Sequence, residues 1–170
     1  ERDKVAVDGW GAHFLRLQGP DSGWGGGLYT PKWTSTHYTL LALRRLGLAP
    51  GNRQAGSAAR LLLDEGFRED HGIAYHKSAK GAGETCISGM GLSMFSYFGL
   101  DDDRLDLLAG DLLEEQMADG GWNCRRSRGA THSSFHTTCS VLEGLTDYRR
   151  FRPGSGPPIA GAITAGQEFL

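Results

Sequence analysis

The sequence has no long apolar segment, little cysteine and almost no excess charge of either sign. None of its apolar runs approaches the ~18 residues of a membrane-spanning helix, so no transmembrane segment is predicted. The net charge of −2 gives no basic field to attract nucleic acid, and we expect no such partner. Three cysteines are an odd number, and the fold predicted below needs no disulfide, so we expect reduced thiols in a cytoplasmic protein.

The period-two alternation that is typical of strands is also absent over any useful length. Apolar residues recur at helical spacing instead, which predicts an all-α fold. The expected helices cover roughly residues 4–18, 32–46, 54–66, 85–98, 101–117 and 131–146, and a last one begins after Pro158. Asp101 is the expected cap of the helix over 101–117.

What the sequence does contain is a repeat. Gly23, Gly72 and Gly121 are each 49 residues apart, and each glycine precedes an apolar helix with a polar first turn. A fixed period of this length is typical of stacked helix-pair units, which bury their apolar faces against one another. The segment 159–170 starts another apolar pattern, so residues 1–170 are expected to form a single fragment of about three repeats plus part of a fourth.

Two kinds of helix alternate along the chain. The helices expected at 32–46, 85–98 and 131–146 begin with serine, threonine, histidine or cysteine and end in apolar residues, whereas the others carry more charge. This alternation predicts inner and outer helices of an α/α barrel, with the polar heads of the inner helices at one rim of a cavity. The alternative is a plain α-solenoid without a cavity.

One segment carries a recognisable motif. Residues 116–122 (QMADGGW) have the form Gln-x(3)-Gly-x-Trp, and residues 18–24 (QGPDSGW) are a looser copy. The motif resembles the QW repeat of the terpenoid cyclase and protein prenyltransferase β-subunit superfamily, which includes the squalene–hopene cyclases. The resemblance implies an α/α toroid in which the glutamine and tryptophan tie the end of an outer helix to the next turn.

A second resemblance concerns metal binding. Glu84-Thr85-Cys86 resembles the Asp-x-Cys pair with which prenyltransferase β subunits hold zinc, and His136 lies in a His-Thr-Thr-Cys segment like the one that supplies their third ligand. The resemblance implies Zn²⁺ on Glu84, Cys86 and His136, although glutamate replaces aspartate, and Ile87 and Phe135 replace tyrosines. Chemically, zinc favours these ligand types, but Glu84 reaches Cys86 only from a turn before the helix. Otherwise both Cys86 and His136 are ordinary structural residues.

Candidate substrate-binding residues surround this segment. Lys77 and Lys80 have the spacing of the basic pair that binds the isoprenoid diphosphate in prenyltransferases. Arg125 follows the third glycine turn and either meets a phosphate or lies in a solvated loop. His37, with its neighbour Tyr38, is a candidate for the cavity wall. Phe95, Tyr97 and Phe98 either line an isoprenoid pocket or pack against a neighbouring helix.

The run Asp101-Asp102-Asp103 invites comparison with the catalytic acid motif of squalene–hopene-type cyclases. Its place at the start of an outer helix favours a role at the helix terminus, where carboxylates are stabilised by the helix dipole.

The expected function is that of a prenyltransferase-like domain that binds an isoprenoid diphosphate in its cavity, with zinc-dependent transfer of the prenyl group to a thiol. A terpene-cyclase-like enzyme and a non-catalytic toroid that binds a hydrophobic ligand or a protein are the alternatives. The expected partners are an isoprenoid or another hydrophobic small molecule, further repeats of the same chain, and a helical partner subunit.

Overall fold

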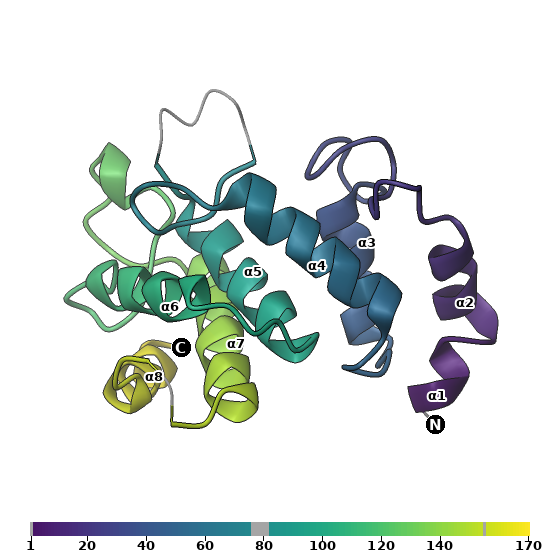
Figure 1. The fold of residues 1–170 in the computed structure, drawn as a ribbon. Coiled ribbons are helices and arrows are strands. Elements are labelled where there is room, and N and C mark those ends of the chain that lie inside the picture. The colour runs from purple at the N-terminus through teal and green to yellow at the C-terminus, as the bar shows by residue number, and fades with distance from the viewer. Residues whose placement is uncertain (1, 76–81, 155) are drawn as a thin grey trace.

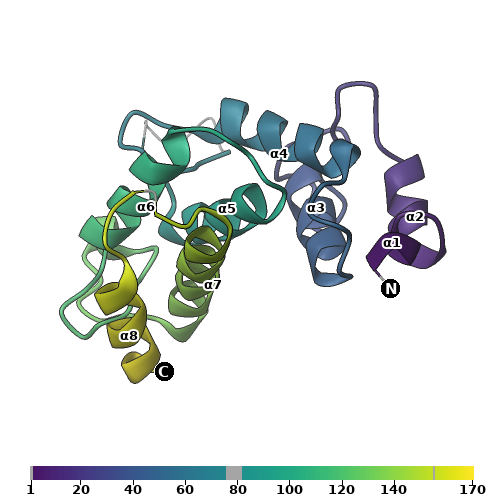
Figure 2. The ribbon, with the colours of Figure 1, turned by 60° about the horizontal axis from the view of Figure 1, so that its bottom comes forward.

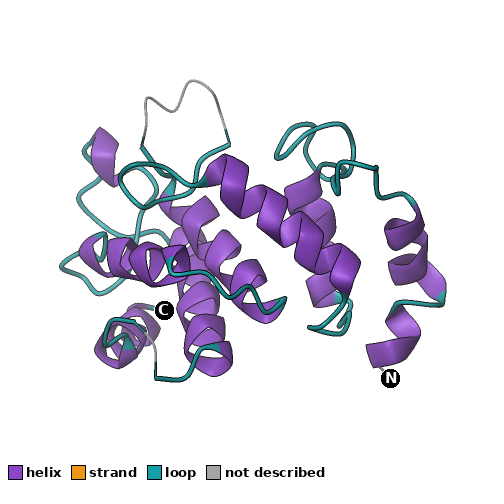
Figure 3. Cartoon of the chain, in the orientation of Figure 1, coloured by secondary structure: helices purple, strands orange, loops and turns teal. Residues whose placement is uncertain are grey.

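The computed structural model describes residues 2–75, 82–154 and 156–170, and these residues form an all-α fold, as predicted (Figures 1 and 3). The described residues contain no β-strand, and an isolated bridge joins Phe67 to Ile73. None of the described helices combines the length and apolar character that crossing a bilayer requires. The helices are α1 (Arg2–Val5), α2 (Gly9–Arg16), α3 (Thr36–Arg45), α4 (Arg53–Gly66), α5 (Thr85–Tyr97), α6 (Arg104–Glu114), η1 (Arg126–Arg128), α7 (Phe135–Phe151) and α8 (Ala160–Phe169).

The helices follow one another across the molecule, from α1 and α2 at one end to α6 and α8 at the other (Figures 1 and 2). The pair α5 and α7 forms the centre, and nearly every residue of α5 is buried. The two helices approach closely at Gly89 and Gly144, where a β-carbon on either glycine would collide with the backbone of the facing helix.

The 49-residue period recurs in the hydrogen bonds of three turns. The carbonyl oxygens of Gly23, Gly72 and Gly121 accept bonds from the backbone N–H groups of Gly19, Arg68 and Met117, at 2.8, 3.0 and 2.9 Å. The residue directly before each of these three glycines has a positive φ, which is 67° at Ser22, 68° at His71 and 90° at Gly120. Equivalent positions along the sequence therefore adopt equivalent backbone conformations.

The glutamine and tryptophan of the QW-like segments join helices to these turns. Trp24 donates through Nε1 to the carbonyl oxygen of Phe14 at 2.7 Å, and Trp122 donates in the same way to Leu112 at 2.6 Å. Gln116 donates to the carbonyl oxygens of Gly120 and Ala162, which connects the end of α6 with α8. Gln18 makes the equivalent bonds to Ser22 and Gln54, and both tryptophans are buried. These contacts agree with the structural role expected of the motif.

Several helix boundaries differ from the prediction. The region 4–18 is divided into α1 and α2. α3 begins at Thr36 rather than near residue 32, because Trp33 has a φ of 73°, which a helix cannot contain. α7 begins at Phe135 rather than near 131, since Ser134 caps it by accepting a bond from the Thr137 N–H. α7 also continues beyond residue 146 to Phe151.

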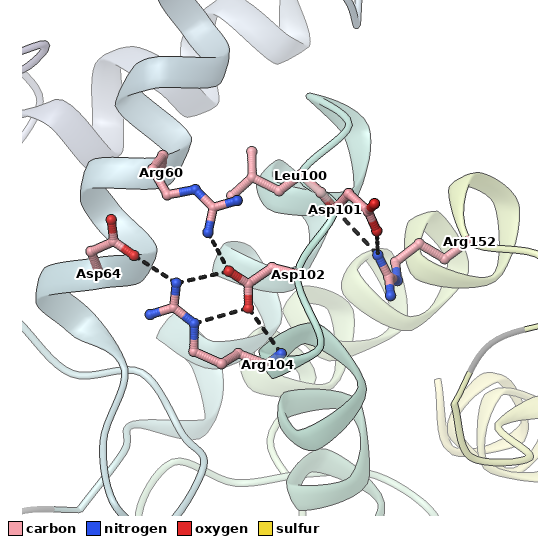
Figure 4. Close-up of polar contacts among 7 residues, drawn as sticks. All are labelled: Arg60, Asp64, Leu100, Asp101, Asp102, Arg104 and Arg152. Atoms are coloured by element: carbon pink, nitrogen blue, oxygen red, sulfur yellow. Dashed lines mark hydrogen bonds and ion pairs between the residues drawn. The ribbon is translucent and has the colours of Figure 1, made fainter.

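The aspartate run lies at the start of α6, but Asp103 and not Asp101 is the N-cap residue. The carboxylate of Asp102 is paired with the guanidinium groups of Arg60 and Arg104, and Arg104 also reaches Asp64 at 2.6 Å (Figure 4). The pKa of Asp102 lies well below its usual range, mainly because Arg104 donates hydrogen bonds to this carboxylate. This carboxylate therefore joins α4 to α6 and carries no proton to donate to a substrate.

Candidate functional site

A cavity of about 780 Å³ lies between α2, α3, α5 and α7. Its lining is mostly aromatic or aliphatic, and Cys86 of α5 and His136 of α7 also contribute. The lining residues are Trp10, Phe14, Tyr29, Lys32, Trp33, Tyr38, Leu41, Ala42, Arg45, Leu46, Cys86, Met90 and His136. The three helices with polar first turns, α3, α5 and α7, thus contribute to one cavity, and α2 adds a wall that the sequence did not suggest.

Helical spacing explains how the walls form. On α3 the lining positions 38, 41, 42 and 45 follow the three- and four-residue steps of a single helix face. Positions 10 and 14 of α2, and positions 86 and 90 of α5, are likewise one turn apart. The cavity therefore runs beside α3, whose 10 residues correspond to a length of about 15 Å.

Aromatic rings dominate the part of the cavity near the start of α3. The ring of Tyr38 lies 5.1 Å from that of Tyr29 and 5.1 Å from that of Trp33, measured between centroids. Trp10 and Trp33 keep 71% and 77% of their surface exposed, although large apolar side chains are usually buried. These two tryptophans give the cavity lining an apolar surface that is open to solvent.

The charged side chains of the lining lie towards the ends of α3. Lys32 precedes the helix and Arg45 is its last residue, and both are exposed. The middle of the cavity is therefore apolar. Such an arrangement suits a long apolar molecule with a polar or anionic end.

His37 lies behind this aromatic wall rather than in it. Its side chain is fully buried, and its ring packs against those of Tyr29, Tyr38 and Tyr75 at 5.2, 5.3 and 5.6 Å. Among the residues that the structure describes, neither ring nitrogen has a hydrogen-bond partner, and the hydroxyl of Tyr75 is also buried without one. Burial lowers the pKa of His37 to about 4, so the imidazole is neutral at physiological pH.

The predicted zinc ligands come only partly together. Cys86 and His136 both line the cavity, and Glu84 lies beside Cys86 as the N-cap residue of α5. Within residues 2–75, 82–154 and 156–170, however, no three histidine, cysteine, aspartate or glutamate side chains are placed so that they could hold a metal ion. Burial, together with the neighbouring Cys124 and Glu84, raises the pKa of the Cys86 thiol to about 12.

The predicted diphosphate ligands are not part of this cavity as described. Lys77 and Lys80 lie outside the described residues. Arg125 is exposed and lines a separate open hollow with Arg128 and His132. Phe95 is fully buried and Tyr97 donates its hydroxyl to the Leu48 carbonyl oxygen at 2.7 Å, so these aromatic residues pack between helices and do not line the cavity.

Comparisons of the chain with protein-family models, with curated proteins and with solved structures found no match. Function is therefore inferred from the cavity and from the residues that line it.

Proposed function

We propose that the chain is part of an α/α toroid of the terpenoid cyclase and prenyltransferase type, and that its cavity binds an isoprenoid or a similar elongated apolar molecule. The observation that carries this proposal is the cavity of about 780 Å³ between α2, α3, α5 and α7. Its volume is in the range of small-molecule sites, and its lining is mainly apolar with a few polar groups.

The toroid is supported by the repetition of the turns and by the alternation of the helices. Three turns 49 residues apart share one hydrogen bond and one positive φ. Repeats of this kind stack with a constant rotation, and their equivalent helices gather on one side of the array. The three helices α3, α5 and α7 that reach the cavity are successive members of such a series.

Prenyl transfer to a thiol, with zinc on Glu84, Cys86 and His136, stays a prediction. Cys86 and His136 share the cavity, but the described side chains do not form a set of three ligands. We therefore assign no step to zinc. Metal analysis of the purified chain tests this prediction directly, because a zinc site with these ligands retains close to one metal ion per chain.

The binding proposal is tested with two probes, farnesol and farnesyl diphosphate, which share the apolar chain and differ in the charged end. Binding is followed by tryptophan fluorescence, because Trp10 and Trp33 line the cavity. We expect saturable binding of farnesol, with a spectral change that is lost when both Trp10 and Trp33 are replaced by phenylalanine. Tighter binding of the diphosphate would add support for a site that recognises the charged end.

A matched pair of variants places the ligand. Ala42→Phe puts a ring into the cavity from the lining face of α3, whereas Ala160→Phe adds the same ring at the exposed first residue of α8. The first variant should weaken farnesol binding at least tenfold, which corresponds to about 1.4 kcal/mol, and the second should leave it unchanged. Failure of the native chain to bind either probe, or equal binding by both variants, would refute the proposal.

A further inference from the structure

We propose that the loop between Trp122 and α7 binds a phosphate group in the open hollow beside it, separate from the apolar cavity. The two share no lining residue. Among the described residues, the lining of the hollow contains two guanidinium groups and an imidazole, no carboxylate, and little apolar surface. The lining residues are Asn123, Arg125, Arg128, Gly129, Ala130 and His132. Such a lining suits an anion rather than an isoprenoid tail.

The backbone of the loop is closed by its own hydrogen bonds. The Ala130 N–H donates to the Arg125 carbonyl oxygen at 3.1 Å. Asn123 joins the two ends of the loop, since its Nδ2 donates to the His132 carbonyl oxygen at 2.8 Å and its Oδ1 accepts from the Arg125 N–H at 2.9 Å. Gly129 has a φ of 89°, which allows the chain to turn back after η1. The side chains of the hollow are therefore attached to a defined frame.

The short helix η1 gives its arginines different roles. A 3₁₀-helix has three residues per turn, so side chains three residues apart lie above one another. Arg125, the N-cap residue of η1, and Arg128, its last residue, have this spacing, and both line the hollow. Arg126 reaches the end of α6 instead, where its Nη1 donates to the Glu114 carbonyl oxygen at 2.7 Å and to the Glu115 carboxylate at 2.9 Å. Arg126 thus fastens the loop, and the other two arginines remain for a ligand.

The side-chain donors of the lining are not used within the described part of the chain. Among those residues, neither Arg125 nor Arg128 has an ion pair or a side-chain hydrogen bond, and the ring of His132 has no hydrogen-bond partner. The carboxylate of Asp119, which precedes the loop, is engaged by the Ser133 N–H at 2.8 Å. The hollow therefore keeps a local positive charge, although the whole chain has a net charge of −2.

A phosphate group matches these donors. Each guanidinium presents a planar fork of N–H groups that binds two phosphate oxygens, and it stays charged at physiological pH. Because exposed charges are screened over about 8 Å at physiological ionic strength, recognition requires direct contact and should weaken as salt is added. A soluble organic phosphate and the headgroup of an anionic phospholipid both carry this group, and experiment separates these two sources.

A titration of the native chain with inorganic phosphate locates the site, because the amide proton and nitrogen chemical shifts report contacts residue by residue. We expect saturable shifts concentrated in residues 123–132 and a dissociation constant that rises when sodium chloride is added. Shifts that do not saturate, or that leave this loop unchanged, would overturn the proposal. This measurement needs no variant, so it does not depend on how a substituted chain folds.

A matched pair of double variants tests the two arginines. Arg125→Gln with Arg128→Gln removes both forks, whereas Arg149→Gln with Arg150→Gln removes the same charge from the exposed end of α7. The first should raise the dissociation constant of phosphate by roughly tenfold or more, because charge-assisted hydrogen bonds are lost, and the second by less than roughly twofold. Equal weakening by the two double variants would show a general effect of net charge and refute the site.

Vesicles distinguish the two sources of the phosphate group. Cosedimentation with phosphatidylcholine vesicles, with and without phosphatidic acid, is compared for the native chain and both double variants. Binding that requires phosphatidic acid and is lost in Arg125→Gln with Arg128→Gln assigns the site to a lipid headgroup. Binding of inorganic phosphate without binding of vesicles assigns it to a soluble phosphate. Farnesol binding involves the separate apolar cavity, so its outcome is independent of these measurements.

Discussion

At the scale of single residues, Trp122 is a side chain whose loss should be costly. Its side chain is fully buried, and its Nε1 donates to the Leu112 carbonyl oxygen at 2.6 Å. Replacing Trp122 by alanine leaves a large void and an unsatisfied carbonyl, so the free energy of unfolding should fall by about 3–5 kcal/mol. Trp33→Ala is the control, because this exposed ring should contribute no more than about 0.5 kcal/mol. Equal urea midpoints for the two variants would contradict the assignment.

His37 should make the stability of the chain depend on pH. Its pKa is about 4 in the folded chain, against 6.5 for an unperturbed histidine, so the unfolded chain takes up a proton at a higher pH than the folded chain. The free energy of unfolding should therefore fall as the pH decreases from 6.5 to about 4, by about 3 kcal/mol in total.

Urea unfolding at several pH values measures this dependence. His37→Leu should remove it, and the exposed His13→Leu should keep it. His37→Leu should also be as stable as the native chain at neutral pH, because neither ring nitrogen of His37 has a hydrogen-bond partner among the described residues. A slope between pH 4 and 6.5 that survives in His37→Leu would show that another group is responsible.

At the scale of the helices, the contact between α5 and α7 depends on glycine. A β-carbon on Gly89 would lie 2.7 Å from the Ser140 carbonyl oxygen and 2.8 Å from the Val141 Cα, both on the backbone of α7. Gly89→Ala should therefore force the helices apart and destabilise the fold by about 1–3 kcal/mol. Gly110→Ala, on α6 with open space around it, should instead stabilise by roughly 0.5–1 kcal/mol. Thermal denaturation of both variants tests the contrast, and a neutral Gly89→Ala would disprove the close contact.

The helices also show what can be read from the sequence. The period of apolar residues predicts that helices form near α4, α5 and α8, because that period is local and strong. The start of α6 could not be placed in the same way. Asp102 is held by Arg60, which lies 42 residues earlier on α4, and such a partner leaves no local signal (Figure 4).

The candidate site was predictable to a similar extent. Cys86 and His136 were singled out by motif, and both line the cavity. Trp10 and Trp33 were not singled out. Trp10 lies on a helix face and Trp33 in a loop, and neither setting has a local pattern that separates a binding surface from ordinary packing.

At the scale of the whole molecule, one polar network connects α3, α5 and α7, three of the four helices that surround the cavity. Arg44 of α3 donates through Nε to Asp147 of α7 at 3.1 Å and through Nη1 to Glu143 at 2.6 Å. Ser93 of α5 donates to the same Asp147 carboxylate at 2.8 Å. Only 13% of the Arg44 side chain and 11% of the Asp147 side chain are exposed, so water replaces these bonds poorly.

Arg44→Met should therefore leave Asp147 as a buried and largely uncompensated charge, at a cost of about 3–5 kcal/mol. Arg60→Met is the matched control, because Arg60 also pairs with an aspartate across two helices but keeps 40% of its side chain exposed. Its loss should cost no more than about 1 kcal/mol. Urea unfolding gives both values. The double variant Arg44→Met with Asp147→Leu should regain most of the loss, since it removes the stranded carboxylate. Equal effects of the two single variants would show that α3 is held to α7 by apolar packing alone, and the cavity between them would then keep its shape without this network.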